Sequence, residues 1–371
     1  MVEPVPYPLG GNTPARNGST SSAAWRADLK SAIQAEVDAF LEHRCLDSLA
    51  DAGVEQAVTV LRDYLTGGKC VRSTFMYLGW LTGAADDDAA LRAAASLELL
   101  HAFALIQDDV MDESALRRGR PAAHITFARW HRARSLSGSA TRFGESAAVL
   151  LGDLCLVWSE QMLRESGLGP DELARCWRHY DDMRVELAVG QFADLLNDAA
   201  TLPTMDAVMA VLRRKSGNYT VRRPLELGAA LARCDDDVIA GLGAYGELIG
   251  ECFQLRDDIL DVTGSPAQTG KPAGVDLAAR KATSVVVMAH RLAGSDVRRE
   301  LTELMRLAEL TPRDVERLRA LIVGSGAVEG VEHMIDERVS RALTHLGSLD
   351  VSSTAVDALA DMAISCGERA A

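Results

Sequence analysis

The stretch "LELLHAFALIQDDVMDESALRRGRP", residues 97–121, joins an almost wholly apolar run to a dense group of charges. Asp108, Asp109 and Asp112 fall within five residues, and Arg117 and Arg118 follow closely. Residues three or four apart share one face of a helix, so these carboxylates would repel one another. The spacing DDxxD therefore predicts either a solvated surface or a site in which a cation lies between the acids.

A second copy of this spacing favours the cation site. "QLRDDILD", residues 254–261, gives Asp257, Asp258 and Asp261, again after an apolar helical run. Other acidic groups, at 86–88, 181–182 and 235–237, lack the spacing and are interpreted as solvated helix ends or loops. Carboxylates without nearby histidine or cysteine suit Mg²⁺, which keeps waters and binds substrate phosphates. We therefore expect Mg²⁺ ions that hold a diphosphate between two carboxylate clusters.

Basic residues near both motifs would complete such a site. They are Arg117, Arg118, Lys215, Lys271 and Lys281. A further segment, "GGKCVRS" at 67–73, places Lys69 and Arg72 after two glycines at the start of an apolar helix. Backbone amides at a helix N-terminus bind anions together with Lys and Arg, so this segment predicts a second diphosphate pocket.

The composition is that of an ordinary globular protein, with 48% hydrophobic and 25% charged residues. A net charge of −14 argues against a nucleic-acid footprint and against polybasic attachment to anionic lipid. Seven scattered cysteines without a CxxC spacing indicate reduced thiols in a cytoplasmic protein. No apolar run approaches the ~18–20 residues of a membrane span.

The organisation along the chain predicts an all-α protein. Residues 1–22, rich in Pro, Gly and Ser, predict a flexible N-terminal leader, and residues 23–371 a single all-helical domain. Residues 132–144 form a polar connector, and no sustained alternating strand pattern occurs. The expected helices are 26–46, 53–66, 69–82, 89–112, 145–165, 171–198, 205–215, 217–233, 235–262, 278–293, 297–308, 312–322, 326–347 and 353–366.

The ordered set of motifs resembles one known family. GGKxxR, then DDxxD with RRGxP, then FQxxDDxxD with GK and a downstream Asp is similar to the trans-isoprenyl diphosphate synthases of the polyprenyl synthetase family. The resemblance spans roughly residues 60–290, and its pattern is nearest to short-chain geranylgeranyl and farnesyl diphosphate synthases. It implies the isoprenoid synthase fold, a single large bundle of antiparallel helices around a deep apolar cavity, usually paired as a homodimer.

The resemblance also implies a reaction. An allylic diphosphate (dimethylallyl, geranyl or farnesyl) ionises with the help of Mg²⁺, and the carbocation attacks isopentenyl diphosphate before a proton is lost. Departure of diphosphate requires charge neutralisation, and the carbocation must meet its partner rather than water. The expected enzyme is thus a cytoplasmic prenyltransferase without a membrane span or a nucleic-acid partner.

Roles follow for the matching residues. The principal ligands of about three Mg²⁺ ions are expected to be Asp108, Asp112 and Asp257, supported by Asp109, Asp258 and Asp261. The allylic diphosphate is expected to bind Arg117, Lys215, Lys271 and Lys281. Isopentenyl diphosphate is expected to bind Lys69, Arg72, His101 and Arg118. The residues expected to line the reacting carbons are Gln191, Ser216 and Gln254, with Lys215 as a further catalytic residue.

Some positions depart from the usual pattern of the family or bear on product length. Cys70 stands where the family usually has Arg, Ser73 where it has Pro, and Ser216 where it has Thr. The first motif has no insertion, and Ala104 and Phe103 lie four and five residues before Asp108. A single aromatic residue beside a small one is typical of the twenty-carbon product, which predicts geranylgeranyl diphosphate. Farnesyl diphosphate is the alternative.

Two further functions remain open at this stage. A class I terpene cyclase shares the fold and ionises the same diphosphates, but it needs no isopentenyl site. A non-catalytic partner subunit of a heteromeric synthase would keep the fold without needing complete metal motifs. Lys69, Arg72 and the second DDxxD argue against the cyclase, and the complete metal motifs argue against the partner subunit.

Overall fold

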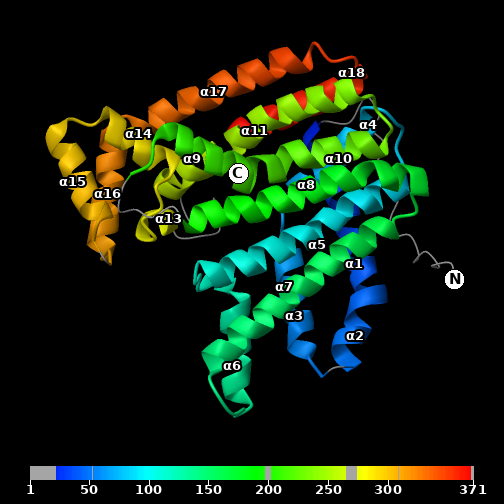
Figure 1. Cartoon of the computed structure of the whole chain (residues 1–371), viewed down its shortest axis with the longest axis horizontal. Helices are drawn as coiled ribbons and strands as arrows, with labels where there is room; N and C mark the ends of the chain where they lie inside the picture. The colour runs from blue at the N-terminus through cyan, green and yellow to red at the C-terminus, as the bar shows by residue number, and fades with distance from the viewer. Residues whose placement is uncertain (1–21, 52, 197–201, 265–273, 308, 369–371) are drawn as a thin grey trace. The chain divides into compact units, whose positions relative to one another are not determined.

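The computed structural model describes residues 22–51, 53–196, 202–264, 274–307 and 309–368, which are almost entirely helical (Figure 1). The prediction of an all-α protein is confirmed. The predicted leader lies outside the described residues except for Ser22, where the first helix begins. Contacts divide the chain into two compact units: unit 1 is 1–176 with 228–233, and unit 2 is 177–227 with 234–371. A single domain over 23–371 stays a prediction.

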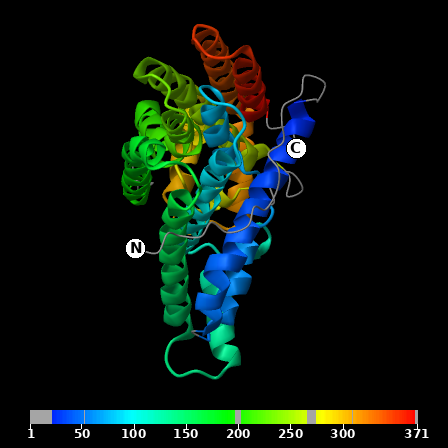
Figure 2. The same cartoon turned by 90° about the vertical axis from the view of Figure 1, so that its right-hand side faces the viewer.

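Unit 1 contains the first aspartate motif. Its helices are α1 (Ser22–Phe40), α2 (Leu46–Asp51), α3 (Glu55–Leu65), α4 (Val71–Leu81), α5 (Asp88–Met111), α6 (Ala123–Ala133) and α7 (Ala140–Arg164). A π-helical turn, η1 (Leu41–Cys45), joins α1 to α2, and α8 (Pro170–Leu195) begins in this unit. In Figures 1 and 2 the turn between α6 and α7 lies at the lower end of the view.

Helix α5 forms the core of unit 1. It begins where the side chain of Asp87 accepts hydrogen bonds from the amides of Ala89 and Ala90, which is a standard N-cap. Its residues from 90 to 100 are all buried, and its most extensive packing is against α7. A Cβ on Gly152 of α7 would lie only 3.0 Å from Nε2 of Gln107, so this glycine lets the two helices approach closely. The rigid core carries the motif at its C-terminal end.

A short hairpin follows α5 and turns the chain back. Its strands, β1 (Leu116–Arg117) and β2 (Arg120–Pro121), pair antiparallel. The two turn residues, Arg118 and Gly119, both have positive φ, 51° and 75°. Two-residue hairpin loops favour this conformation because its twist matches that of the strands. The hairpin therefore places Arg117 on a strand and Arg118 in the turn, directly after the first motif.

Unit 2 contains the second aspartate motif on its longest helix, α11 (Asp236–Thr263). The other elements are the rest of α8, α9 (Met205–Leu212), η2 (Arg213–Arg222), α10 (Arg223–Leu231, which ends in unit 1), α13 (Val275–Ala278), α14 (Ser284–Leu292), α15 (Ser295–Met305), α16 (Pro312–Gly324), α17 (Ala327–Leu346) and α18 (Ser353–Glu368). Helix α11 packs against η2 and against α17, which runs along it in Figure 1. Buried Leu255, Ile259 and Val262 join α11 to the core of this unit.

Four segments differ from the sequence predictions. Residues 123–133 form α6, although no helix was expected there. The expected break at residue 216 is a π-helix, η2, within a continuous helical run. The helix expected at 278–293 begins only at Ser284, because residues 279–283, which follow α13, are not helical. Two-residue strands occur where no strand was expected.

Among the described residues, two helices are long and apolar enough to cross a membrane by length and composition. They are α5 and α7, and 72% and 44% of their most apolar windows are buried within the structure. The core helix of a water-soluble protein passes the same test, so this property of α5 follows from its burial.

Candidate active site

The first motif has one carboxylate that is neutralised inside the protein. Asp109 is completely buried, and the guanidinium of Arg117 bonds to it through both Nε and Nη2. The hydroxyl of Tyr64 donates to Oδ2 of Asp109 at 2.6 Å and accepts from the amide of Ala123 at 3.1 Å. Burial, together with the charge of Asp109, raises the pKa of Tyr64. Asp109 therefore ties the end of α5 to α3, to the hairpin and to α6.

The other two carboxylates of this motif are more accessible. The side chain of Asp108 is 26% exposed, and one of its oxygens lies 3.4 Å from Nη2 of Arg117. Asp112 is half-buried and caps the C-terminal end of α5. The residues predicted to set product length, Phe103 and Ala104, are half-buried on the same helix. Asp108 and Asp112 are thus the two positions of the motif that a cation can reach.

Unit 1 also gathers cations around a buried glutamate that the sequence reasoning did not identify. The hydroxyl of Ser73 donates to Oε1 of Glu98 at 2.6 Å. Burial raises the pKa of Glu98, although the Ser73 hydrogen bond and the charges of Arg72 and Arg118 act in the opposite direction. Cys70 also bonds to Glu98 and stands at the N-cap of α4 with φ 49°. Cys70, Arg72 and Ser73 of the GGKCVRS segment therefore all interact with the carboxylate of Glu98.

His101 lies in the same cluster as a neutral ring. Burial lowers its pKa well below the ordinary value, and the charges of Arg72, Arg118 and Arg117 lower it further. Arg118 is held by the backbone, since its Nη1 donates to the carbonyls of Tyr64 at 3.2 Å and Thr66 at 2.7 Å. Lys69 is exposed at the edge of this segment. The structure thus brings Arg72, His101 and Arg118 into one electrostatic cluster.

Unit 2 contains a pocket that gathers most of the remaining predicted residues. Its lining is Asp194, Val208, Val211, Leu212, Lys215, Ser216, Gln254, Asp258, Asp276, Lys281, Ala282 and Thr283. Nζ of Lys215 lies 2.5 Å from Oδ2 of Asp194, and Nζ of Lys281 lies 3.9 Å from the same oxygen. Asp194 therefore holds two cations on one side of the pocket. Lys271 lies outside the described residues.

The second motif has carboxylates whose hydrogen-bond donors are neutral. The amide and hydroxyl of Ser284 donate to Oδ2 of Asp258 at 3.0 and 2.6 Å, and Nε2 of Gln254 donates to Oδ1 at 3.2 Å. Burial raises the pKa of Asp258 to about 6, although these hydrogen bonds oppose the shift. Burial and the charge of Asp276 raise the pKa of Asp261 to about 6 as well. Asp257, on the same helix, is half-buried.

Two polar atoms near these residues are buried without a hydrogen-bond partner in the described part of the chain. They are Oγ1 of Thr283, which lines the pocket, and Nε2 of Gln191 on α8. Buried polar atoms almost always have a hydrogen-bond partner, so atoms without one indicate where a ligand or a water molecule would bind. Both of these atoms lie in unit 2, as do Lys215 and Lys281.

The donor set of the two motifs fits Mg²⁺. No group of three or more His, Cys, Asp or Glu side chains converges on one metal position among the described residues. Mg²⁺ does not require such a group, because it usually takes one or two carboxylates and completes its octahedron with water and substrate phosphates. Asp108 and Asp112 in unit 1, and Asp257 in unit 2, supply hard oxygen donors of this kind.

A model of the polyprenyl synthetase family matches residues 55–322, a range that includes both aspartate motifs. The chain is 34% identical over 283 residues to the geranylgeranyl diphosphate synthase of Mycobacterium tuberculosis, covering 76% of this chain and 75% of that protein. It is 28% identical over 321 residues to the geranylfarnesyl diphosphate synthase of Aeropyrum pernix, covering 84% and 94%.

Among solved structures, the chain is similar to a geranylgeranyl pyrophosphate synthase from Corynebacterium glutamicum complexed with isoprenyl diphosphate and magnesium. The TM-score is 0.86 at 35% identity, and the match covers 92% of this chain and 99% of that one. The similarity therefore extends over nearly the whole helical structure.

Proposed function

The chain belongs to the polyprenyl synthetase family, and from this premise we propose that it joins isopentenyl diphosphate to an allylic diphosphate, giving geranylgeranyl diphosphate. The observation that carries the proposal is that each unit has its own cation cluster close in sequence or space to a DDxxD motif. Unit 1 groups Arg72, Arg118 and neutral His101, and unit 2 groups Lys215 and Lys281 in a pocket. Two clusters suit a reaction with two diphosphate substrates.

The allylic diphosphate would bind in the unit 2 pocket. Lys215 and Lys281 are held near Asp194, and a diphosphate would take over the interactions that this carboxylate now makes with them. Thr283 would donate its unsatisfied hydroxyl to a diphosphate oxygen. Arg117 and Lys271 would complete this set of cations. Fixed positive charge at the leaving diphosphate favours ionisation, since it stabilises the charge that develops there.

Asp108, Asp112 and Asp257 would hold about three Mg²⁺ ions, the accessible carboxylates being the ligands. Mg²⁺ would supply neutralisation of the departing diphosphate when bound. Asp109, Asp258 and Asp261 have a supporting role in this proposal, because their carboxylates already bond to Arg117, Ser284 and the amide of Asp276. The related Corynebacterium structure is complexed with isoprenyl diphosphate and magnesium, which supports the proposal that Mg²⁺ binds together with a diphosphate.

Isopentenyl diphosphate would bind in unit 1, at Lys69, Arg72, His101 and Arg118. His101 is neutral there and so can donate a hydrogen bond without adding charge. Glu98 keeps Arg72 and Arg118 near each other until the diphosphate arrives. Cys70, which replaces the usual arginine, is buried against Glu98 and adds no positive charge. We therefore expect weaker isopentenyl diphosphate binding than an arginine at this position would give.

The reacting carbons would lie among weak dipoles and apolar side chains. Ser216 and Gln254 line the pocket, and Gln191 has a buried amide nitrogen that lacks a partner in the described residues. Oxygen dipoles of these side chains would stabilise the carbocation, and exclusion of water would direct it to isopentenyl diphosphate. Loss of a proton then gives the new allylic product.

Product length is tested directly. The purified protein is incubated with Mg²⁺, isopentenyl diphosphate and each of dimethylallyl, geranyl and farnesyl diphosphate in turn, and the products are dephosphorylated and identified. The expected product is the twenty-carbon alcohol, because Ala104 and Phe103 leave room for that length. A fifteen-carbon product would show farnesyl diphosphate synthase instead. The different product lengths named among the relatives make this measurement necessary.

The same assay distinguishes the other functions. Mg²⁺-dependent diphosphate release that requires both substrates supports the synthase. Release from the allylic substrate alone would support a class I terpene cyclase. No release in either case would support a non-catalytic partner subunit of a heteromeric synthase.

We also propose that the protein is a cytoplasmic homodimer. Leu150, Leu154 and Val157 form an exposed apolar stripe on α7 of unit 1. On α8, Val189 and Phe192 are exposed, Phe192 at 69%, and Leu196 in the turn directly after this helix is 80% exposed. Monomeric proteins rarely leave such stripes in water. Light scattering should give twice the mass of one chain, and Phe192→Glu should shift that mass toward the monomer if α8 forms the contact.

A further inference from the structure

The segment that carries Lys215 and Ser216 has an unusual backbone. Residues Arg213–Arg222 form the π-helix η2, and the flanking residues Leu212 and Arg223 have ordinary helical dihedrals. It therefore interrupts a continuous helical run without breaking it. π-helical segments are rare, usually a single turn, and often occur at functional sites. A ten-residue segment needs specific contacts to hold it in this form.

Glycines on both neighbouring helices allow the backbone of η2 to pack unusually closely. A Cβ on Gly250 of α11 would lie 2.3 Å from the carbonyl oxygen of Gly217, and a Cβ on Gly246 would lie 2.6 Å from Cα of Arg222. On the other side, a Cβ on Gly190 of α8 would lie 2.6 Å from the amide nitrogen of Lys215. These contacts bring the backbone of η2 close to both neighbouring helices.

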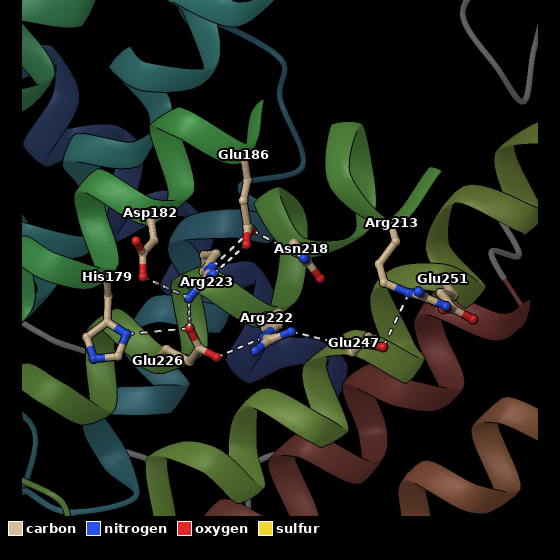
Figure 3. Close-up of polar contacts among 10 residues, drawn as sticks. All are labelled: His179, Asp182, Glu186, Arg213, Asn218, Arg222, Arg223, Glu226, Glu247 and Glu251. Carbon is tan, nitrogen blue, oxygen red and sulfur yellow. Dashed lines mark hydrogen bonds and ion pairs between the residues drawn. The ribbon is translucent and has the colours of Figure 1, made fainter. Parts of the chain in front are cut away.

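One carboxylate bonds to both ends of η2. Oε1 of Glu247 lies 3.2 Å from Nε of Arg213, the first residue of η2. Oε2 of Glu247 accepts a hydrogen bond at 2.9 Å from Nη1 of Arg222, the last residue. Figure 3 shows both interactions converging on Glu247. Because Glu247 belongs to α11, it links both ends of η2 to the helix that carries the second aspartate motif.

This arrangement depends on the π-helical form. Arg213 and Arg222 are nine residues apart, which in an α-helix of 3.6 residues per turn is about two and a half turns and puts them on opposite faces. With hydrogen bonds from i to i+5, the helix has about 4.4 residues per turn, so nine residues make about two full turns. Both arginines then lie on one face. Glu247 can bond to both of them only while the segment is π-helical.

The surrounding ion pairs reinforce this contact. Glu251 bonds to Arg213 at 2.7 Å, and Glu226 bonds to Arg222 at 2.9 Å. On the opposite side, Glu186 of α8 accepts from Nδ2 of Asn218 at 3.2 Å (Figure 3). The network further includes His179, Asp182, Arg223 and Arg338. Arg213, Asn218 and Arg222 of η2, and the next residue, Arg223, are thus tied to carboxylates on α8, α10 and α11.

We propose that Glu247 is a positioning residue that holds η2 in its π-helical register and thereby sets the places of Lys215 and Ser216 in the unit 2 pocket. The inference rests on the proposed role of Lys215 in binding the allylic diphosphate. Glu247, Arg213 and Arg222 are each about one-third exposed, and ion pairs of that kind add little to global stability. Glu247 should therefore matter more for the position of η2 than for folding.

The first test is Glu247→Gln, which keeps the size of the side chain but offers an oxygen to only one of the two arginines. The KM for geranyl or farnesyl diphosphate should rise about tenfold, because a displacement of a binding group by a fraction of an ångström weakens its contacts. The KM for isopentenyl diphosphate should change less than about twofold, since its proposed ligands are not on η2. An equal change in both KM values, or none in either, would overturn the proposal.

Glu300→Gln is the matched control. Glu300 also forms a two-pronged pair with an arginine in unit 2, Arg317, but this pair joins α15 to α16. Both KM values should stay at those of the unaltered protein. If Glu300→Gln raises the allylic KM as Glu247→Gln does, the effect is a general loss of ion pairs and the proposal fails.

A double-mutant cycle tests whether Glu247 acts through Lys215. Glu247→Gln is combined with Lys215→Met, and binding of inorganic diphosphate with Mg²⁺ is measured by calorimetry, so that no turnover is needed. In the Lys215→Met protein, Glu247→Gln should weaken binding less than about twofold, because coupled residues are not additive. Independent, multiplying effects would overturn the proposal.

Arg213→Lys and Arg222→Lys provide a second route if Glu247→Gln does not fold. Each keeps a positive charge but loses the planar fork, so each should raise the allylic KM selectively. An effect at only one end would contradict the requirement for both. Failure of the unaltered protein to make any prenyl product would instead reject the proposed function, which separates the two conclusions.

Discussion

The two aspartate motifs have the same spacing but different electrostatic surroundings. In unit 1, the buried Asp109 is bonded to the guanidinium of Arg117 and to the hydroxyl of Tyr64. In unit 2, the corresponding Asp258 receives its hydrogen bonds from the neutral groups of Ser284 and Gln254. The middle carboxylate of the first motif, Asp109, is thus paired with a cation that lies eight residues later in the chain. The middle carboxylate of the second motif, Asp258, is held by neutral hydrogen-bond donors.

This difference shows that spacing alone does not determine the state of a carboxylate. Burial raises the pKa values of Asp258 and Asp261 to about 6, so their ionised forms are costly where they stand. A divalent cation near such carboxylates favours ionisation. Unit 2 is therefore the half whose carboxylates gain more from a bound cation, while the middle carboxylate of the first motif is already compensated by Arg117.

The largest effect is expected at the accessible carboxylates. Asp108→Asn and Asp257→Asn should each lower kcat about 1,000-fold, because each removes a negative ligand that holds Mg²⁺ against the leaving diphosphate. Steady-state assays at saturating Mg²⁺ measure this. Asp237→Asn, in an exposed acidic group without the motif spacing, should stay within about twofold. A large loss at Asp108 with none at Asp257 would mean that the second motif holds no essential metal.

The next effect concerns stability and separates the motifs. Arg117→Met should lower the free energy of unfolding by about 3 kcal/mol, because it leaves the fully buried Asp109 without its cation. Urea denaturation measures the change. The double substitution Arg117→Met with Asp109→Asn should recover part of the loss, since the buried charge is then removed too. No recovery would mean that Arg117 stabilises unit 1 by packing rather than by charge.

A smaller loss is expected at the second motif. Ser284→Ala removes one of the donors to Asp258, but the backbone amide of residue 284 and Gln254 remain. The free energy of unfolding should fall by about 1.5 kcal/mol, as is usual for a hydrogen bond to a charged group. Urea denaturation under the same conditions allows direct comparison with Arg117→Met. A loss as large as that of Arg117→Met would remove the contrast between the motifs.

The sequence predicted the two motif helices well because their signals are local. Helix α5 was expected at 89–112 and α11 at 235–262, and the observed helices are Asp88–Met111 and Asp236–Thr263. Both have long apolar runs that start near an aspartate, which is a recognisable N-terminal signal. The same local character made the DDxxD spacing readable without any structure.

Elements that depend on distant contacts were not predicted. The polar segment around residue 216 reads as a break, yet it is held as a π-helix by Gly250 and Glu247, which come more than twenty-five residues later. Helix α6 buries mainly small or polar residues on one face, such as Ala123 and His124, so its apolar signal is weak. The interruption before α14 occurs where Asp258 accepts from the amide of Ser284.

Only part of the site was predicted, again because some of its contacts join residues that are distant in the sequence. Cations and carboxylates in motifs were found from their spacing, but the partners Asp194 and Glu98 were not. Asp194 contacts Lys215 from 21 residues away, and Glu98 contacts Ser73 from 25 residues away. A signal did exist for both, since Asp194 lies three residues after Gln191 and Glu98 three before His101, on the same helix faces. Nothing in that spacing, however, identifies which cation each one meets.

The smallest expected effect on rate tests whether the aromatic residues that precede the two motifs have the same task. Phe103 lies five residues before the first motif and is half-buried, whereas Phe253 lies four before the second and is buried in unit 2. Phe103→Ala should lengthen the product by at least one five-carbon unit with kcat within about fivefold, because it removes a ring from the proposed channel without removing a charge.

Phe253→Ala should instead leave the product at twenty carbons and lower the free energy of unfolding by about 3 kcal/mol, as expected for loss of a buried ring. Chromatography of the dephosphorylated products, together with urea denaturation of each variant, measures both outcomes. If Phe103→Ala leaves the product unchanged, the end of the channel lies elsewhere and this position of α5 is structural. If Phe253→Ala lengthens the product, the second motif helix also lines the channel, and the contrast between the two motifs is confined to their charges.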